Sequence, residues 1–136
     1  TSLLLLPKLS CLYRLVLFLK PRMIKSHPFV EETRNQVALA YGPVIYCLES
    51  TDIPSNIPID NIVIPRDFKP KVRYDNDLLG GIVILEGNVF IEGQETNNLY
   101  HDYAPNDRST VSVKMIPYYA WNNRGEPSMS VWLPLY

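Results

Sequence analysis

Short apolar runs separated by turn-forming residues recur along this chain of 136 residues. Runs of this kind are typical of strands in an antiparallel sandwich or barrel, and no long stretch has the spacing of an amphipathic helix. We therefore expect an all-β fold, an antiparallel β-sandwich of jelly-roll-like type with little or no helix. The predicted strands are Tyr13–Leu19, Gln36–Tyr41, Val44–Glu49, Ile62–Ile64, Gly81–Leu85, Val89–Glu92, Thr110–Ile116, Tyr118–Trp121 and Met129–Leu133.

Turn residues indicate how these strands connect. Gly42-Pro43 and Glu86-Gly87-Asn88 each separate two apolar runs and favour tight reversals, so each predicts a hairpin. The segment Ser50–Asp77 contains four prolines, which cannot donate to a central ladder, and it predicts a long ordered connection over the edge of the sandwich. A second, polar loop is expected over Gly93–Ser109.

Composition narrows the class of protein. The chain has 12 prolines, well above the average of about 5% of residues, which disfavours long helices. Its formal net charge is −1 and its basic residues are scattered singly, which excludes nucleic acid as a main partner. Its two cysteines and two histidines do not have the spacing of a zinc site. One domain with one core fits this length.

The first 19 residues are leucine-rich but interrupted by Pro7, Lys8 and Arg14. A membrane span needs about 20 nearly continuous apolar residues, and a secretory signal carries its positive charge ahead of the apolar run. We therefore expect neither, nor any membrane partner, and the compartment stays open. The predicted division is an atypical lead-in over residues 1–19, cut from or fused to a longer chain, and a β-sandwich domain over residues 20–136.

The residue types used in catalysis do not form a convincing group. Paired carboxylates can act as general acid and base at a glycosidic bond, and Glu31-Glu32 is the only adjacent pair of glutamates. Neighbours on an extended segment point to opposite faces, however, so these two cannot flank one sugar. His101-Asp102 lacks any accompanying nucleophile motif. Cys47 lies inside an apolar run, where a free cysteine behaves as a small buried hydrophobe. We predict no catalytic residue and no metal site in this chain.

The aromatic residues near the end are the best candidates for contact with a ligand or another domain. Rings, amides and a guanidinium gather in one stretch, and the alternation of residues 128–133 places Trp132 on a face with serines. Such side chains can stack on a sugar or fill a seam between domains, and the alternative for Trp132 is burial in a sheet covered on both faces. The candidate sugar-binding or interdomain residues are Tyr119, Trp121, Asn122, Arg124 and Trp132.

Two long motifs resemble a known family. The first is V-E-E-T-R-N-Q-V-A-L from Val30, followed by Y-G-P-V-I-Y-C-L-E-S from Tyr41, and the second is V-K-M-I-P-Y-Y-A-W-N-N-R-G from Val113, with Val131-Trp132 after it. Both resemble the C-terminal region of the beta-L-arabinofuranosidase family, glycoside hydrolase family 127. The resemblance covers about residues 20–135, whereas residues 1–19 fit it less well.

The resemblance implies a larger bacterial enzyme in which an (α/α)6 barrel carries catalysis and β-sandwich domains pack on it. In that family the barrel holds a cysteine nucleophile, a zinc bound by cysteines and a glutamate, and a glutamate acid/base. None of these roles transfers to Cys11 or Cys47, because this chain has no Cys-Cys pair and no barrel helices. Zinc is therefore implied only for the catalytic domain, and no cofactor for this chain.

The function that the resemblance implies is that of an accessory β-sandwich in a retaining glycoside hydrolase. Its partners would be the catalytic barrel and arabinose-containing glycans, and the chain alone would be inactive. The alternatives are a stand-alone carbohydrate-binding module, in which Trp121 and Trp132 bind glycan without help, and a truncated gene product without function.

Overall fold

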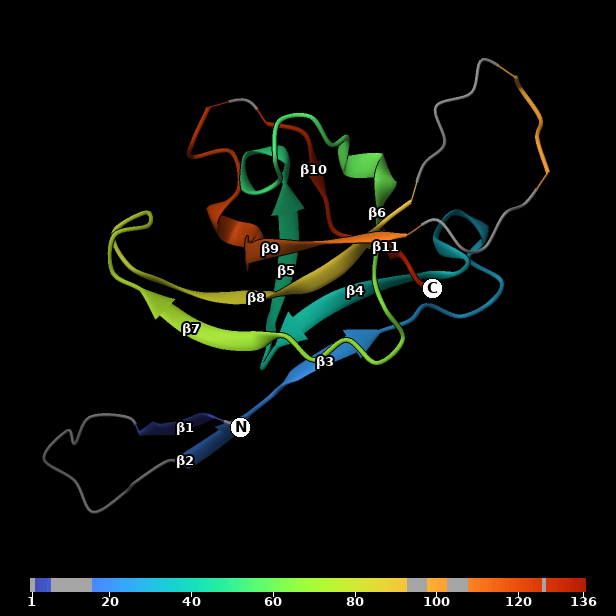
Figure 1. Ribbon diagram of the computed structural model, residues 1–136. Coiled ribbons are helices and arrows are strands. Elements are labelled where there is room, and N and C mark those ends of the chain that lie inside the picture. The colour runs from blue at the N-terminus through green and yellow to red at the C-terminus, as the bar shows by residue number, and fades with distance from the viewer. Residues whose placement is uncertain (1, 6–15, 93–97, 103–107, 126) are drawn as a thin grey trace, which may run out of the picture.

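The computed structural model describes residues 2–5, 16–92, 98–102, 108–125 and 127–136, with the backbone alone for 2–5 and 16–18 (Figure 1). Within these residues every helix is a 3-10 turn of three residues, and none is long and apolar enough to cross a membrane. The all-β prediction is confirmed. The strands are β1 (Ser2–Leu5), β2 (Val16–Leu19), β3 (Pro21–Ile24), β4 (Gln36–Tyr41), β5 (Val44–Glu49), β6 (Ile62–Val63), β7 (Lys71–Asp75), β8 (Ile82–Ile91), β9 (Ser109–Pro117), β10 (Met129–Ser130) and β11 (Leu133–Pro134), and the 3-10 turns are η1 (Glu31–Thr33), η2 (Ser50–Asp52), η3 (Ile59–Asn61) and η4 (Tyr118–Ala120).

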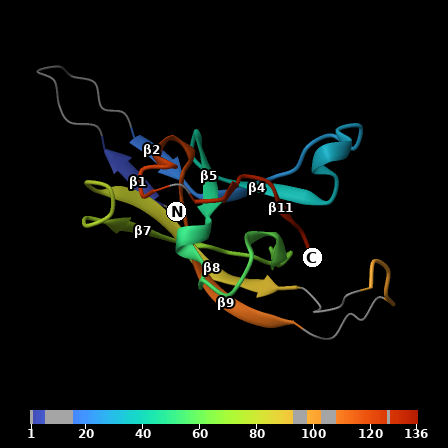
Figure 2. The ribbon, with the colours of Figure 1, turned by 90° about the horizontal axis from the view of Figure 1, so that it is seen from above.

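The described strands form a main sheet of nine and a separate hairpin of two. The main path is β11-β4-β5-β9-β8-β6, with β3 beside β4, β7 beside β8 and β10 beside β5, and every named strand pair is antiparallel. The two ends of this path meet, because the Ile64 N–H donates to the Pro134 carbonyl at 2.8 Å and the Tyr136 N–H to the Ile64 carbonyl at 2.9 Å. The sheet therefore curls back on itself. In Figure 2, β3, β4 and β11 lie on one side and β7, β8 and β9 on the other, while the β1–β2 hairpin projects away.

Both faces of β5 are buried, as its alternating side chains show. Tyr46 and Leu48 point into the main core between the two sides of the curled sheet. Cys47, between them, joins a smaller cluster on the opposite face, where Ala120 of η4 covers it. The outer face of β5 is thus closed by the turn that follows β9, which fixes the position of the aromatic residues described below.

The Gly42-Pro43 hairpin is confirmed, whereas the hairpin predicted at Glu86-Gly87-Asn88 is wrong. Tyr41 pairs with Val44 across the first turn, and Gly42 adopts the left-handed region at φ 59°. The second segment lies inside the continuous strand β8. A Cβ on Gly87 would lie 2.7 Å from a ring carbon of Phe68, so the glycine there permits close packing rather than a turn.

Three further differences concern strand bounds. The predicted connection Ser50–Asp77 contains β7, a five-residue edge strand that pairs with β8. This strand can form because Pro70 precedes it and no proline lies within it. The predicted strand Tyr118–Trp121 is the 3-10 turn η4, since Pro117 ends the strand before it. The predicted strand Met129–Leu133 is broken at residues 131–132, which form a bend between β10 and β11. Residues 93–97 and 103–107 of the predicted polar loop lie outside the described residues.

Candidate functional site

Residues 118–125, called here the aromatic turn, present three large rings to solvent. Ala120 is buried against the outer face of β5, and the Trp121 N–H donates to the Tyr118 carbonyl at 3.2 Å, which closes η4. The flanking side chains therefore point outward, with exposed fractions of 47% for Tyr118, 70% for Tyr119 and 37% for Trp121. The Tyr118 and Trp121 ring centroids lie 6.5 Å apart with their planes tilted by 30°.

Arg124 turns inward and ties the aromatic turn to the body of the domain. Its Nη1 donates to Asp52 Oδ1 at 2.9 Å and its Nη2 to Asp52 Oδ2 at 2.7 Å, a bidentate pair with η2. The same Nη2 lies 3.7 Å from Oε1 of Glu49, which is fully buried at the end of β5. The hydrogen bond to Asp52 is the main cause that raises the pKa of Arg124 above its usual value, so the guanidinium stays charged.

This charge cluster is incompletely satisfied. Neither carboxylate oxygen of Glu49 has a hydrogen-bond partner among the described residues, and neither does the buried Nε of Arg124. The 3.7 Å separation between the two side chains is an ion-pair contact and is too long for a hydrogen bond. Glu49 therefore depends on Arg124 for electrostatic compensation, because a buried carboxylate without an opposite charge is costly.

Of the five predicted site residues, four lie on the aromatic turn. Tyr119 and Trp121 are open to solvent, Asn122 is exposed with φ 66°, and Arg124 is engaged by carboxylates of its own domain. Trp132 is half-buried in the bend after β10, where its carbonyl accepts a hydrogen bond from Ser130 Oγ at 2.7 Å. The strand alternation that placed it on a serine face does not apply, because residues 131–132 are not extended as a strand.

The residues of catalytic type do not assemble in the described part of the chain. Glu31 and Glu32 are exposed on η1, His101 and Asp102 are exposed, and Cys11 lies outside the described residues. No group of three or more His, Cys, Asp or Glu among the described residues could hold a metal ion. Burial, with smaller contributions from nearby carboxylates, raises the pKa of Cys47 to about 12. A thiol of this kind is a poor nucleophile, because nucleophilic attack needs the thiolate.

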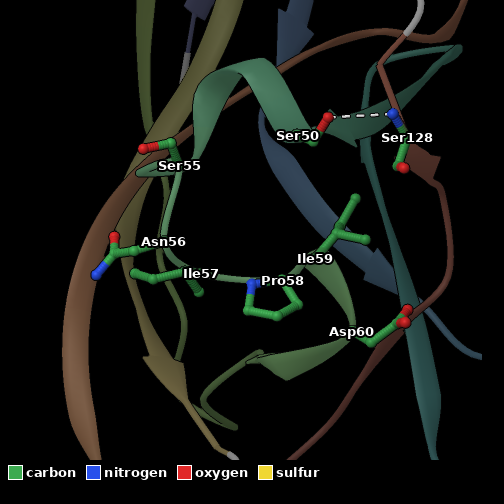
Figure 3. A pocket seen from close by; sticks show the side chains of 8 residues that line it. All are labelled: Ser50, Ser55, Asn56, Ile57, Pro58, Ile59, Asp60 and Ser128. Carbon is green, nitrogen blue, oxygen red and sulfur yellow. Dashed lines mark hydrogen bonds between the residues drawn. The ribbon is translucent and has the colours of Figure 1, made fainter.

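A hollow of about 370 Å³ beside η2 and η3 is a feature that the sequence reasoning missed. All of its described lining residues except Ser128 lie in Ser50–Asp77, for which the sequence predicts only a connection between strands. The signal that could have indicated it is the concentration of serine, asparagine and proline there, which form turns with free polar side chains. Its lining residues are Ser50, Ser55, Asn56, Ile57, Pro58, Ile59, Asp60 and Ser128 (Figure 3).

Comparison with known families decides the relationship. The family described as the glycoside hydrolase family 127 C-terminal domain matches residues 21–134, which include every strand of the main sheet. This chain belongs to that family. The resemblance inferred from the two sequence motifs is thereby confirmed, and residues 1–19 fall outside the matched region.

Individual relatives agree with the family assignment. The chain is 28% identical over 116 residues to a non-reducing end beta-L-arabinofuranosidase of Bifidobacterium longum, covering 81% of this chain and 17% of that protein. Among solved structures, a glycoside hydrolase is 40% identical with a TM-score of 0.78, over 87% of this chain and 20% of the other. A family 127 beta-L-arabinofuranosidase from Geobacillus stearothermophilus T6 is 33% identical with a TM-score of 0.74, over 91% and 21% respectively. The chain thus spans about a fifth of the length of the proteins it matches.

Proposed function

We propose that this chain is the C-terminal support domain of a retaining glycoside hydrolase of the beta-L-arabinofuranosidase type, and that its aromatic turn packs against the catalytic (α/α)6 barrel. Two observations support this assignment: the chain belongs to the family 127 C-terminal domain, and it matches only about a fifth of the length of its relatives. The observation that supports this contact surface is the group of exposed rings on a turn whose Ala120 is buried against β5.

The aromatic turn is anchored at both ends, as a preformed contact surface would be. Ala120 anchors it to the outer face of β5, and the bidentate pair between Arg124 and Asp52 fixes its far end. Rings held in this way lose little side-chain entropy when a partner covers them. Large aromatic side chains are also enriched at the centre of protein interfaces, where a few residues supply most of the binding free energy.

In this proposal the reaction chemistry belongs to the barrel. A zinc ion there would supply Lewis-acid and thiolate-stabilising chemistry, with arabinose-containing glycans as the substrate class. The described residues of this chain do not fit a zinc site, since no three or more His, Cys, Asp or Glu side chains gather among them. The chain's contribution is folding stability and the position of the barrel relative to its accessory domains.

A domain exchange tests the proposal. This chain would replace the C-terminal domain of the Geobacillus enzyme, to which it is 33% identical. We expect Tyr119→Ser and Trp121→Ser to lower the melting temperature and the hydrolysis rate of the chimera on an aryl beta-L-arabinofuranoside. In the isolated chain Tyr119→Ser should leave the melting temperature unchanged, because Tyr119 is 70% exposed, and Trp121→Ser, at a side chain that is 37% exposed, should lower it less than in the chimera. Tyr100→Ser, at a tyrosine that is 86% exposed elsewhere, is the matched control.

Two results would contradict the support role. One is a chimera whose stability and rate do not respond to the changes in the aromatic turn. The other is saturable binding of arabino-oligosaccharides to the isolated chain, followed by tryptophan fluorescence and lost in Trp121→Ala, which would favour a carbohydrate-binding module. The isolated chain itself, with or without zinc, should not hydrolyse the aryl glycoside.

A further inference from the structure

The hollow beside η2 and η3 is a preformed concavity that the proposed support role does not use. Its volume of about 370 Å³ falls in the range of roughly 300–1,000 Å³ that is usual for small-molecule sites. The segment from Ser50 to Asp60 forms most of its wall, and Ser128, distant in sequence, completes it (Figure 3).

Hydrogen bonds and two partly buried isoleucines hold this wall in shape. The Ser50 N–H donates to the Ser128 carbonyl at 2.8 Å, and the Ser128 N–H donates to Ser50 Oγ at 3.1 Å, so the two sides of the hollow are joined directly. The Ile57 N–H donates to the Pro54 carbonyl at 2.9 Å, which closes a turn between them. Ile57 also packs on the main core, as does Ile59. A wall fixed in this way needs little ordering when a ligand binds.

The free groups around the hollow suit a polyhydroxylated ligand. Ser55, Asn56 and Asp60 are exposed, and within the described residues their side chains have no hydrogen-bond or ion-pair partner. In Figure 3, Asn56 and Asp60 lie at opposite ends of the wall, with Ile57 and Pro58 between them, so polar groups stand on either side of an apolar stretch. A sugar offers hydroxyls to such groups and a C–H face to such a stretch.

Charge decides between neutral and anionic ligands. Among the described residues that line the hollow, only Asp60 is charged. The nearby carboxylate of Asp52 is already paired with Arg124, and the described lining residues include no lysine or arginine that could balance an anion. We infer that the hollow formed by Ser50–Asp60 and Ser128 binds a neutral sugar unit, at a site separate from the aromatic turn.

Amide chemical shifts of the isotope-labelled 136-residue chain test this inference. The probes are methyl alpha-L-arabinofuranoside, an arabino-oligosaccharide, glucuronate and glycerol. We expect saturable shifts of amides in residues 55–60 with the two neutral sugars, and weaker binding of glucuronate because Asp60 repels it. Glycerol should produce no saturable shift. The inference is overturned if no probe shifts these amides, if glycerol or glucuronate binds as tightly as the neutral sugars, or if the shifts lie on the aromatic turn alone.

Variants locate the binding site. Because one hydrogen bond contributes a modest net free energy, Asn56→Ala and Asp60→Asn should each raise the dissociation constant for the oligosaccharide by about three- to tenfold. Ser128→Phe, which fills the hollow, should abolish the shifts. Asn76→Ala and Asp77→Asn change the same residue types in the exposed turn after β7 and should leave binding unchanged. Equal effects in the two sets of variants would overturn the assignment.

Discussion

Replacing Arg124 by methionine should destabilise the domain strongly. Arg124 compensates two carboxylates, Asp52 at 2.7 and 2.9 Å and the fully buried Glu49 at 3.7 Å. Removing one partner of a buried ion pair costs roughly 3–5 kcal/mol, because the remaining charge is left buried without compensation. Since 21% of the Arg124 side chain is exposed and water can reach it, we expect a loss near the lower limit, about 3 kcal/mol.

Urea unfolding followed by circular dichroism measures this loss, provided that the slope with denaturant does not change. Adding Glu49→Gln to Arg124→Met should recover part of the lost stability, since it removes the uncompensated charge. Arg73→Met is the matched control, because Arg73 pairs with Glu86 and Asp75 on the surface and should contribute far less. A loss below about 1 kcal/mol for Arg124→Met, or no recovery in the double variant, would refute the reasoning.

Three further predictions concern the buried residues Cys47 and Tyr46 and the half-buried Gly87. Burial raises the pKa of Cys47 from 9.0 to about 12. The contribution of the neutral thiol to the free energy of unfolding should therefore be fully present below pH 9.0 and fall by about 1.4 kcal/mol per pH unit from there to pH 12. The difference between wild type and Cys47→Ala in urea unfolding at several pH values isolates this slope. Tyr46→Phe removes a 2.8 Å hydrogen bond to the Val83 carbonyl and should cost about 1 kcal/mol by the same assay. Gly87→Ala should lower the free energy of unfolding by about 1–3 kcal/mol, because the added methyl group meets the Phe68 ring. Combining it with Phe68→Leu should recover part of that loss. No loss in the single variant would contradict the packing argument.

The sequence predicted those strands that its hydrophobic pattern and turn residues specify together. β4 and β5 have the predicted bounds because an unbroken apolar run stands on each side of Gly42-Pro43. β8 was wrongly divided because Gly87 looks the same in sequence whether it permits a turn or makes room for a ring. That distinction depends on Phe68, which is remote along the chain and reaches β8 only in the folded sheet.

The candidate site shows the same limit. The sequence placed four candidates within a few residues of each other, and their shared location follows from sequence proximity alone. It could not show that Arg124 points inward, because its partners Glu49 and Asp52 lie more than 70 residues earlier and depend on β5 and η2 being in place. It could indicate a polar, turn-rich segment over residues 50–60, but not that Ser128 lies beside Ser50 and completes the hollow.

The pair between Arg124 and Asp52 also links the two surfaces proposed here. Asp52 belongs to η2, whose first residue, Ser50, forms part of the hollow, and Arg124 ends the aromatic turn. If this pair restrains both segments, Arg124→Met should speed amide hydrogen exchange in η2 and in the aromatic turn together, beyond any change in global stability. The exposed turn at Asn76, which the pair does not touch, is the internal control. Faster exchange in only one of the two segments would show that the hollow and the aromatic turn are held independently.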